Sequence, residues 1–165
     1  MLYQTVRTNM PRLQTTYFGE LEYSGTSVYQ FPHGLPGFET EQAFVFLRQP
    51  HTEPLMFMQS LANRQLCFIL LPILVADPRY QIGLDPEYAG ELKLTPGRNP
   101  RIGEDILCAA ILSADSGEPS GPTVNLMAPV VVNLRERIGM QVIQTNSSYS
   151  HRHPLFTPQE MLPCS

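Results

Sequence analysis

Histidines and one glutamate are the side chains with the clearest potential for acid–base chemistry. His151 and His153 stand two residues apart near the end of the chain, whereas His33 and Glu39 share a segment rich in proline and glycine. General acid–base catalysis would need two of these groups within hydrogen-bond reach in an apolar pocket. An enzyme that uses His33, Glu39, His151 or His153 is therefore one hypothesis for this chain.

Known catalytic motifs do not strengthen that hypothesis. The sequence contains no Gly-x-Ser-x-Gly elbow, Walker loop, Gly-x-Gly-x-x-Gly or His-Glu-x-x-His. His151 and His153 could suggest a metal site, but neither a Cys-x-x-Cys nor a His-x-x-x-His motif supplies further ligands. We predict a protein that is not an enzyme and that has no cofactor or metal. In this interpretation the histidines belong to a polar terminal strand.

Charge and composition favour a protein partner over a nucleic acid. The net charge is −4, and the basic residues are scattered, with Arg135 and Arg137 as the densest group. Proteins that bind nucleic acids usually carry a basic face, so we expect no direct contact with nucleic acid. A nucleic-acid-binding barrel of the OB type remains an alternative, and it would need a basic groove with exposed aromatic residues. A structural subunit of a larger assembly is a further alternative.

The cysteines and the apolar runs indicate a cytoplasmic protein. Cys67, Cys108 and Cys164 are widely spaced and odd in number, so they form no disulfide framework. The longest apolar run, residues 66–76, contains Pro72 and is too short to span a bilayer. We therefore expect a reducing compartment and no membrane segment.

Proline and the apolar runs together predict an all-β fold. The sixteen prolines fall between short apolar runs, where they limit the length of each element. We predict a small closed or nearly closed β-barrel of short antiparallel strands, with one or two short helical turns, one of them at residues 85–90. A single domain should cover residues 15–156, between an N-terminal extension (1–14) and a C-terminal tail (157–165). The predicted strands are 14–18, 28–31, 43–47, 55–59, 66–71, 106–112, 123–126, 130–133 and 140–144.

Residues 31–39, with the sequence FPHGLPGFE, should form a stiff loop. Two prolines fix the backbone and two glycines permit positive φ angles, which leaves Leu35 and Phe38 as two apolar knobs. Both side chains could point into the core and fill the interior of the barrel, which we call the plug. They could instead form a rigid protein-binding surface that loses little entropy on docking. Because large apolar residues are usually buried, the plug is the favoured interpretation.

Residues 123–133, with the sequence TVNLMAPVVVN, should form a hairpin or a corner of the sheet. We expect Asn125 and Asn133 to bond the local backbone. Pro129 should either begin a strand or lie at an exposed edge, and such an edge could accept a partner strand.

Several segments, in this order, resemble the flagellar assembly factor FliW family. They are TYFGE at 16–20, FPHGLPGFE at 31–39, Gln59-Ser60, TVNLMAPVVVN at 123–133, QVI at 141–143, and Tyr149 followed by RHPL at 152–155. The resemblance covers about residues 15–155. The chain departs from the family pattern in its N-terminal extension, in a nearly neutral stretch at 77–83, and in a longer, more basic loop at 94–101.

The resemblance implies a cytoplasmic regulator with two protein partners. One is newly made flagellin, and the other is CsrA, an RNA-binding repressor that silences flagellin mRNA. Free FliW would bind CsrA away from its RNA surface and lift repression. We expect a monomer, and we expect one apolar contact patch on its surface. The candidate protein-binding residues are Tyr17, Phe18, Leu35, Phe38 and Glu39.

Overall fold

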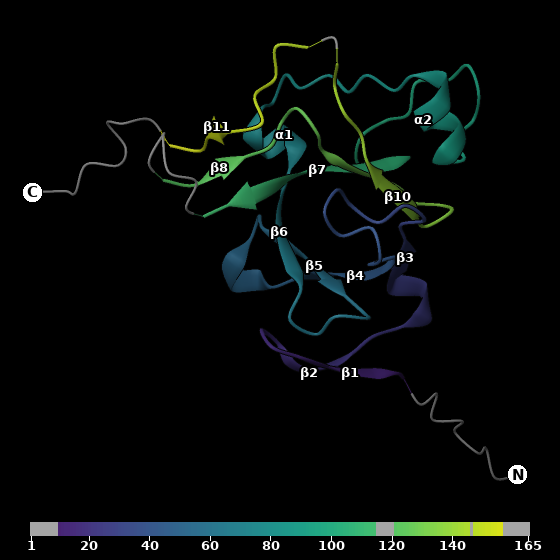
Figure 1. The fold of residues 1–165 in the computed structure, drawn as a ribbon. Helices are drawn as coiled ribbons and strands as arrows, with labels where there is room; N and C mark the ends of the chain where they lie inside the picture. Colours follow the sequence, from purple (N-terminus) through teal and green to yellow (C-terminus); the bar gives the residue numbers. More distant parts are fainter. Residues whose placement is uncertain (1–9, 115–120, 146, 157–165) are drawn as a thin grey trace, which may run out of the picture.

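A computed structural model describes residues 10–114, 121–145 and 147–156 and shows short strands with little helix (Figure 1). Short 3₁₀ turns occupy Gly25–Ser27 and Pro50–Thr52. The helices are α1 (Ile73–Ala76) and α2 (Pro86–Glu91). The strands are β1 (Arg12–Thr15), β2 (Gly19–Glu22), β3 (Val28–Gln30), β4 (Ala43–Arg48), β5 (Met56–Ser60), β6 (Cys67–Pro72), β7 (Ile106–Ser113), β8 (Thr123–Val124), β9 (Val130–Asn133), β10 (Ile138–Gln141) and β11 (His153–Pro154).

Seven strands of the described chain close into a barrel. Their order is β7-β6-β5-β4-β3-β10-β9, and β9 pairs again with β7 to complete the ring. A ring with an odd number of strands cannot be antiparallel throughout. The structure places its parallel pair between β3 and β10, where Gln30 lies opposite Ile138. The prediction of an all-β, closed or nearly closed barrel of short antiparallel strands is confirmed, with one parallel pairing between β3 and β10 that it did not anticipate.

Strands β7 and β9 are covered on both faces, as is the end of β6 at Leu70 and Leu71. Ala109, Val130 and Val132 point into the barrel, where they pack with aromatic residues of β4 and with Leu70. Their neighbours Cys108 and Val131 point outward into a second cluster. Side chains alternate between the two faces of a strand, so a strand with both faces covered carries an unbroken apolar run. This explains the continuous apolar sequences of β7 and β9.

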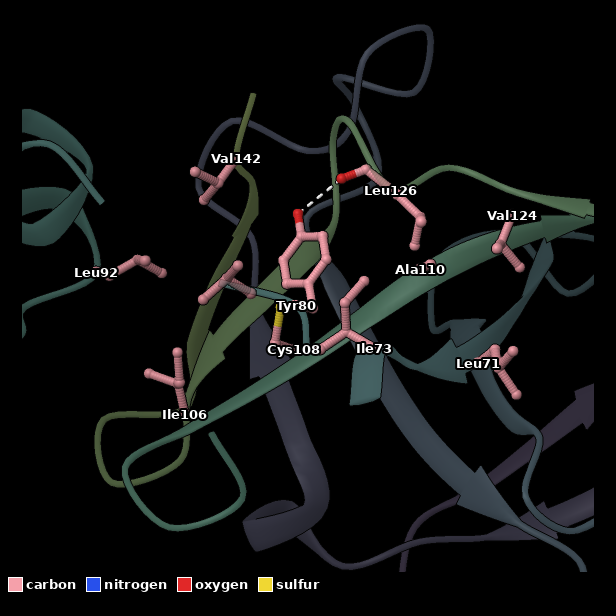
Figure 2. Close-up of a cluster of buried hydrophobic side chains, with 11 residues drawn as sticks. Leu71, Ile73, Tyr80, Leu92, Ile106, Cys108, Ala110, Val124, Leu126 and Val142 are labelled. Atoms are coloured by element: carbon pink, nitrogen blue, oxygen red, sulfur yellow. Dashed lines mark hydrogen bonds between the residues drawn. The ribbon is translucent and has the colours of Figure 1, made fainter. Parts of the chain in front are cut away.

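The second cluster lies under an outer layer built from α1, residues 77–84 and α2. Tyr80 is central to it: its hydroxyl donates a 2.7 Å hydrogen bond to the Leu126 carbonyl (Figure 2). Its ring stacks on Tyr149 with centroids 4.2 Å apart. The Asp85 side chain caps α2 by accepting from Tyr88 N, which confirms the predicted helical turn. Helix α1 was not predicted, because its residues continue the apolar run of β6.

A two-stranded hairpin, β1–β2, forms a separate sheet near the N-terminal end of the described chain (Figure 1). The expected strand at 14–18 is wrong in its second half, because residues 16–18 turn the chain. Thr15 Oγ1 accepts from Phe18 N and donates to Gly19 O, which closes that turn. Strand β1 starts at Arg12, so the ordered structure reaches into the expected extension 1–14.

The cysteines, the C-terminal tail and possible membrane-spanning segments were the other features considered from the sequence. Cys67 is half-buried and Cys108 is buried, both as thiols, and Cys164 lies outside the described residues, as does the expected tail 157–165. No helix in the described ranges has the length and apolar character needed to cross a bilayer.

Candidate functional site

The loop 31–39 is folded tightly back on itself. Phe38 N donates to Leu35 O at 2.7 Å, and Gly34 N donates to Phe31 O at 2.8 Å. Gly34 has a φ of +63°, and a Cβ atom there would lie 2.4 Å from the Phe38 carbonyl oxygen. Glycine is therefore required at this position by both backbone conformation and space. The predicted stiff loop is present.

The two apolar knobs of this loop face different surroundings. Leu35 is 2% exposed and packs with Phe31 and Phe44 in the barrel core, so it is the predicted plug. Its expected place in an exposed contact patch is wrong, because a side chain that fills the barrel cannot also contact a partner. Phe38 is 39% exposed and rests edge-on against Phe68, with centroids 5.1 Å apart. Phe38 thus presents an open aromatic surface on a rigid base.

Glu39 is held beside Phe38 by the backbone. Its Oε1 accepts a hydrogen bond from Gly37 N at 2.9 Å. Backbone hydrogen bonds, chiefly from Gly37, lower the pKa of the Glu39 carboxyl from its ordinary value. A carboxylate with a lowered pKa is a weaker base, so this geometry provides a fixed negative charge beside Phe38 and does not favour proton transfer.

Tyr17 and Phe18 form the tip of the β1–β2 hairpin. Tyr17 is 66% exposed. Phe18 is half-buried and packs edge-on against Phe57 of β5, at a centroid distance of 5.3 Å. The hairpin therefore displays one aromatic ring to solvent and anchors the other on the outside of the barrel.

The structure divides the predicted patch into two. Phe68, beneath Phe38, pairs with the buried Met58 and so lies on the same face of the sheet as Met58. Phe57, beneath Phe18, is the sequence neighbour of Met58 and points to the opposite face. Phe38 and Phe18 consequently pack against opposite faces of the β5–β6 sheet, and they form two surfaces instead of one.

The side chains of the enzyme hypothesis have different partners. His33 Nε2 lies 3.2 Å from Glu91 Oε2 of α2, whereas Glu39 contacts the loop backbone. His153 lies in β11, opposite Val124 of β8. Within the described ranges, no group of three or more histidine, cysteine, aspartate or glutamate residues could hold a metal ion.

The amides of residues 123–133 bond the backbone as predicted. Asn125 Oδ1 accepts from Ala128 N at 2.9 Å, and Asn133 Oδ1 accepts from Arg135 N at 3.0 Å. Asn133 Nδ2 also donates to Leu92 O at 2.8 Å, which ties the end of α2 to the barrel. Pro129 directly precedes β9, in agreement with a strand start.

A groove of about 970 Å³, which the sequence did not indicate, opens between residues 80–84, α2 and the loop 94–102. Its apolar lining includes the side chains of Ile82, Leu84 and Leu94, and its charged lining consists of Arg98 and Arg101. Apart from α2, the walls are irregular segments, which carry no periodic pattern that could have predicted them. The loop 94–101 had been noted only as longer and more basic than the family pattern.

A family model and several known proteins are similar to this chain. The family model described as FliW protein matches residues 12–155. The flagellar assembly factor FliW of Desulfitobacterium hafniense (strain DSM 10664 / DCB-2) is 37% identical over 145 residues, which are 88% of this chain and 91% of that protein. The flagellar assembly factor FliW of Anoxybacillus flavithermus is 36% identical, over 87% of this chain and 94% of the relative.

A solved structure agrees with the sequence relatives. The chain superposes on a crystal structure of the flagellar assembly factor FliW with a TM-score of 0.77. The superposition covers 90% of this chain and 99% of the other, at 33% sequence identity. Sequence and fold therefore point to the same family over nearly all of the described residues.

Proposed function

Because this chain belongs to the FliW family of flagellar assembly factors, we propose that it acts in the cytoplasm as a regulator of flagellin supply. It binds newly made flagellin before export. When it carries no flagellin, it binds the translational repressor CsrA and relieves the repression of flagellin mRNA. It acts as a monomer and by docking, without catalysing a reaction.

The observation that carries this proposal is the match of the FliW family model to residues 12–155. This range includes every described strand, from β1 to β11. The contacts of the acid–base candidates also favour docking over catalysis, because His33 pairs with Glu91 of α2, Glu39 accepts from Gly37 N and His153 lies in β11.

The switch follows from mass action between two mutually exclusive complexes. Each complex needs an interface on the order of 1,000 Å² or more to be specific. The partners must also exchange, so each complex must dissociate quickly compared with the time over which flagellin is made. A rigid barrel with preformed loops suits this task, since it loses little conformational entropy on docking.

Two surfaces are candidates for partner contact. The first, Phe38 with Glu39, combines an open aromatic ring and a fixed negative charge on a stiff loop. The second, Tyr17 with Phe18, lies at the tip of the β1–β2 hairpin. The negative charge of Glu39 suits a basic partner, which CsrA would be as an RNA-binding protein. Leu35 supports the first surface from the core beneath it.

Co-purification of the three proteins tests the switch. The protein is mixed with flagellin and CsrA, and the complexes are separated by gel filtration. We expect two binary complexes and no ternary one. In parallel, addition of the protein should release flagellin mRNA from CsrA in a gel-shift assay, and added flagellin should reverse the release. A stable ternary complex, or CsrA that keeps its RNA at saturating protein, contradicts the proposal.

The contact surface is tested with Phe38→Ala and with Leu35→Ala as the matched control from the same loop. Phe38→Ala should weaken binding of at least one partner by more than tenfold, while the melting temperature falls by no more than a few degrees. Leu35→Ala removes a buried side chain and should destabilise the fold by about 2–5 kcal/mol. If Phe38→Ala leaves the affinity for both partners unchanged, this surface is not a contact site.

A further inference from the structure

We propose that the groove between residues 80–84, α2 and the loop 94–102 is a docking site for an acidic amphipathic segment of a protein partner. The function proposed above names partners but assigns no role to this surface. The inference rests on the apolar floor of the groove, the sign of its charges and the rigidity of its walls.

The floor of the groove is apolar and continues onto an exposed apolar surface. Side chains that line it and pack on the outer core include Ile82, Leu84 and Leu94. At one side, Leu74 of α1 lines the groove and is 42% exposed, and its neighbour Val75 is 52% exposed. A groove of this kind accepts the apolar face of an amphipathic segment, with side chains spaced to fill it.

The charged side chains that line the groove are of one sign. Arg98 and Arg101 line it, and no carboxylate does, although the protein as a whole has a net charge of −4. Arginine presents a planar fork of donors that matches a carboxylate. An acidic segment that replaces the arginines' own carboxylate partners would therefore find complementary charge here.

The ion pairs that hold these arginines are exchangeable. Arg98 lies 3.6 Å from Asp105 Oδ2, which is longer than a charge-assisted hydrogen bond of about 2.7–2.9 Å. Arg101 lies 2.6 Å from Glu104 Oε2, with both side chains 59% exposed, and 3.5 Å from Asp105 Oδ2, whose side chain is 30% exposed. Exposed ion pairs contribute little to stability, so a partner's carboxylate can compete for the guanidinium groups.

Hydrogen bonds anchor residues 81–83 and the Arg101 end of the loop 94–102. The Gln144 side chain accepts from Gly83 N at 2.7 Å and donates to Gly83 O at 3.0 Å, which fastens one wall. Tyr149 Oη accepts from Gln81 N at 2.9 Å. On the other wall, Asp105 Oδ2 accepts from Arg101 N at 2.8 Å. A preformed groove binds more tightly than a mobile one, because it loses less conformational entropy when the partner docks.

The test uses two fluorescein-labelled synthetic peptides of fourteen or so residues. Both carry leucines at positions i, i+3, i+4 and i+7 of a helix, flanked by glutamates in one and by lysines in the other. Binding is measured by fluorescence polarisation. The glutamate peptide should bind about tenfold more tightly than the lysine peptide. The double variant R98E/R101E should reverse this preference.

Two further variants complete the test. Arg64→Glu makes a single arginine-to-glutamate change in the β5–β6 turn, outside the groove lining, and should leave the preference unchanged. Ala89→Trp places a large side chain on α2 inside the groove and should abolish binding, while circular dichroism confirms that the variant is folded.

Three results would overturn the inference. They are equal binding of both peptides, a preference that R98E/R101E does not change, and binding that Ala89→Trp leaves intact in a folded protein. A competition experiment with oleate adds a fourth such result. If oleate binds the groove and the glutamate peptide does not, the groove binds a small anionic amphiphile instead of a protein segment. Because the probes are synthetic, these results do not depend on whether flagellin and CsrA are the partners.

Discussion

Two glycines of the loop 31–39 provide a matched test of how this loop is held. Gly34 and Gly37 both have positive φ angles, +63° and +84°. A Cβ atom at Gly34 would lie 2.4 Å from Phe38 O, whereas a Cβ atom at Gly37 would have nothing within 4 Å. Alanine at either site incurs about 1–2 kcal/mol for the left-handed backbone. Only Gly34→Ala must also push the loop open, which adds about 1–3 kcal/mol by analogy with overpacking.

The expected free energy of unfolding therefore falls by about 2–5 kcal/mol in Gly34→Ala and by about 1–2 kcal/mol in Gly37→Ala. For a domain of this size, 1 kcal/mol corresponds to about 2–4 °C in melting temperature. Urea titration followed by circular dichroism measures both variants against the native protein. If Gly34→Ala is no less stable than Gly37→Ala, the close approach of the Gly34 and Phe38 backbones does not hold the loop as described.

Two further predictions concern the outer layer and the groove wall. Tyr80→Phe should lower the free energy of unfolding by about 1–2 kcal/mol in urea titration, because the Leu126 carbonyl loses the hydrogen bond that the Tyr80 hydroxyl donates. The control Tyr17→Phe changes an exposed ring and should leave the free energy of unfolding unchanged. The hydrogen bond from the Arg101 backbone is the chief cause that lowers the pKa of Asp105. The ionised Asp105 therefore stabilises the fold above pH 3.8, its ordinary pKa, and this stabilisation is lost as the pH falls further. Asp105→Asn should therefore lose less stability between pH 7 and pH 3 than the native protein, and an equal loss would refute this assignment.

Much of the barrel could be predicted from the sequence because its strands are short, apolar and bounded by proline or glycine. Strands β4 to β7 and β9 lie within a residue or two of their predicted ranges. The pairing of β3 with β10, which closes the barrel, could not be predicted. These strands run parallel and pair only at Gln30 and Ile138, and no local sequence pattern specifies such a contact. Helix α1 was missed because its apolar residues continue those of β6.

The candidate surfaces were harder to predict, since exposure depends on which way a loop folds. Leu35 and Phe38 stand three residues apart on the same stiff loop, yet one fills the barrel and the other faces solvent. Tyr17 and Phe18 were expected at the end of a strand and in one patch with Phe38, whereas they form a hairpin tip on which Tyr17 is exposed and Phe18 is half-buried. The groove escaped prediction because its walls come from irregular segments that only tertiary contacts hold in place.

The late closure of the ring has a consequence for synthesis on the ribosome. The barrel is completed by β9 and β10, residues 130–141, which pair with strands that were translated much earlier. Until those residues have left the exit tunnel, β3 and β7 each keep an unpaired edge, and open strand edges promote unwanted pairing between chains. A nascent chain that stalls before residue 130 would be prone to aggregate. The last quarter of the polypeptide therefore protects the preceding three quarters.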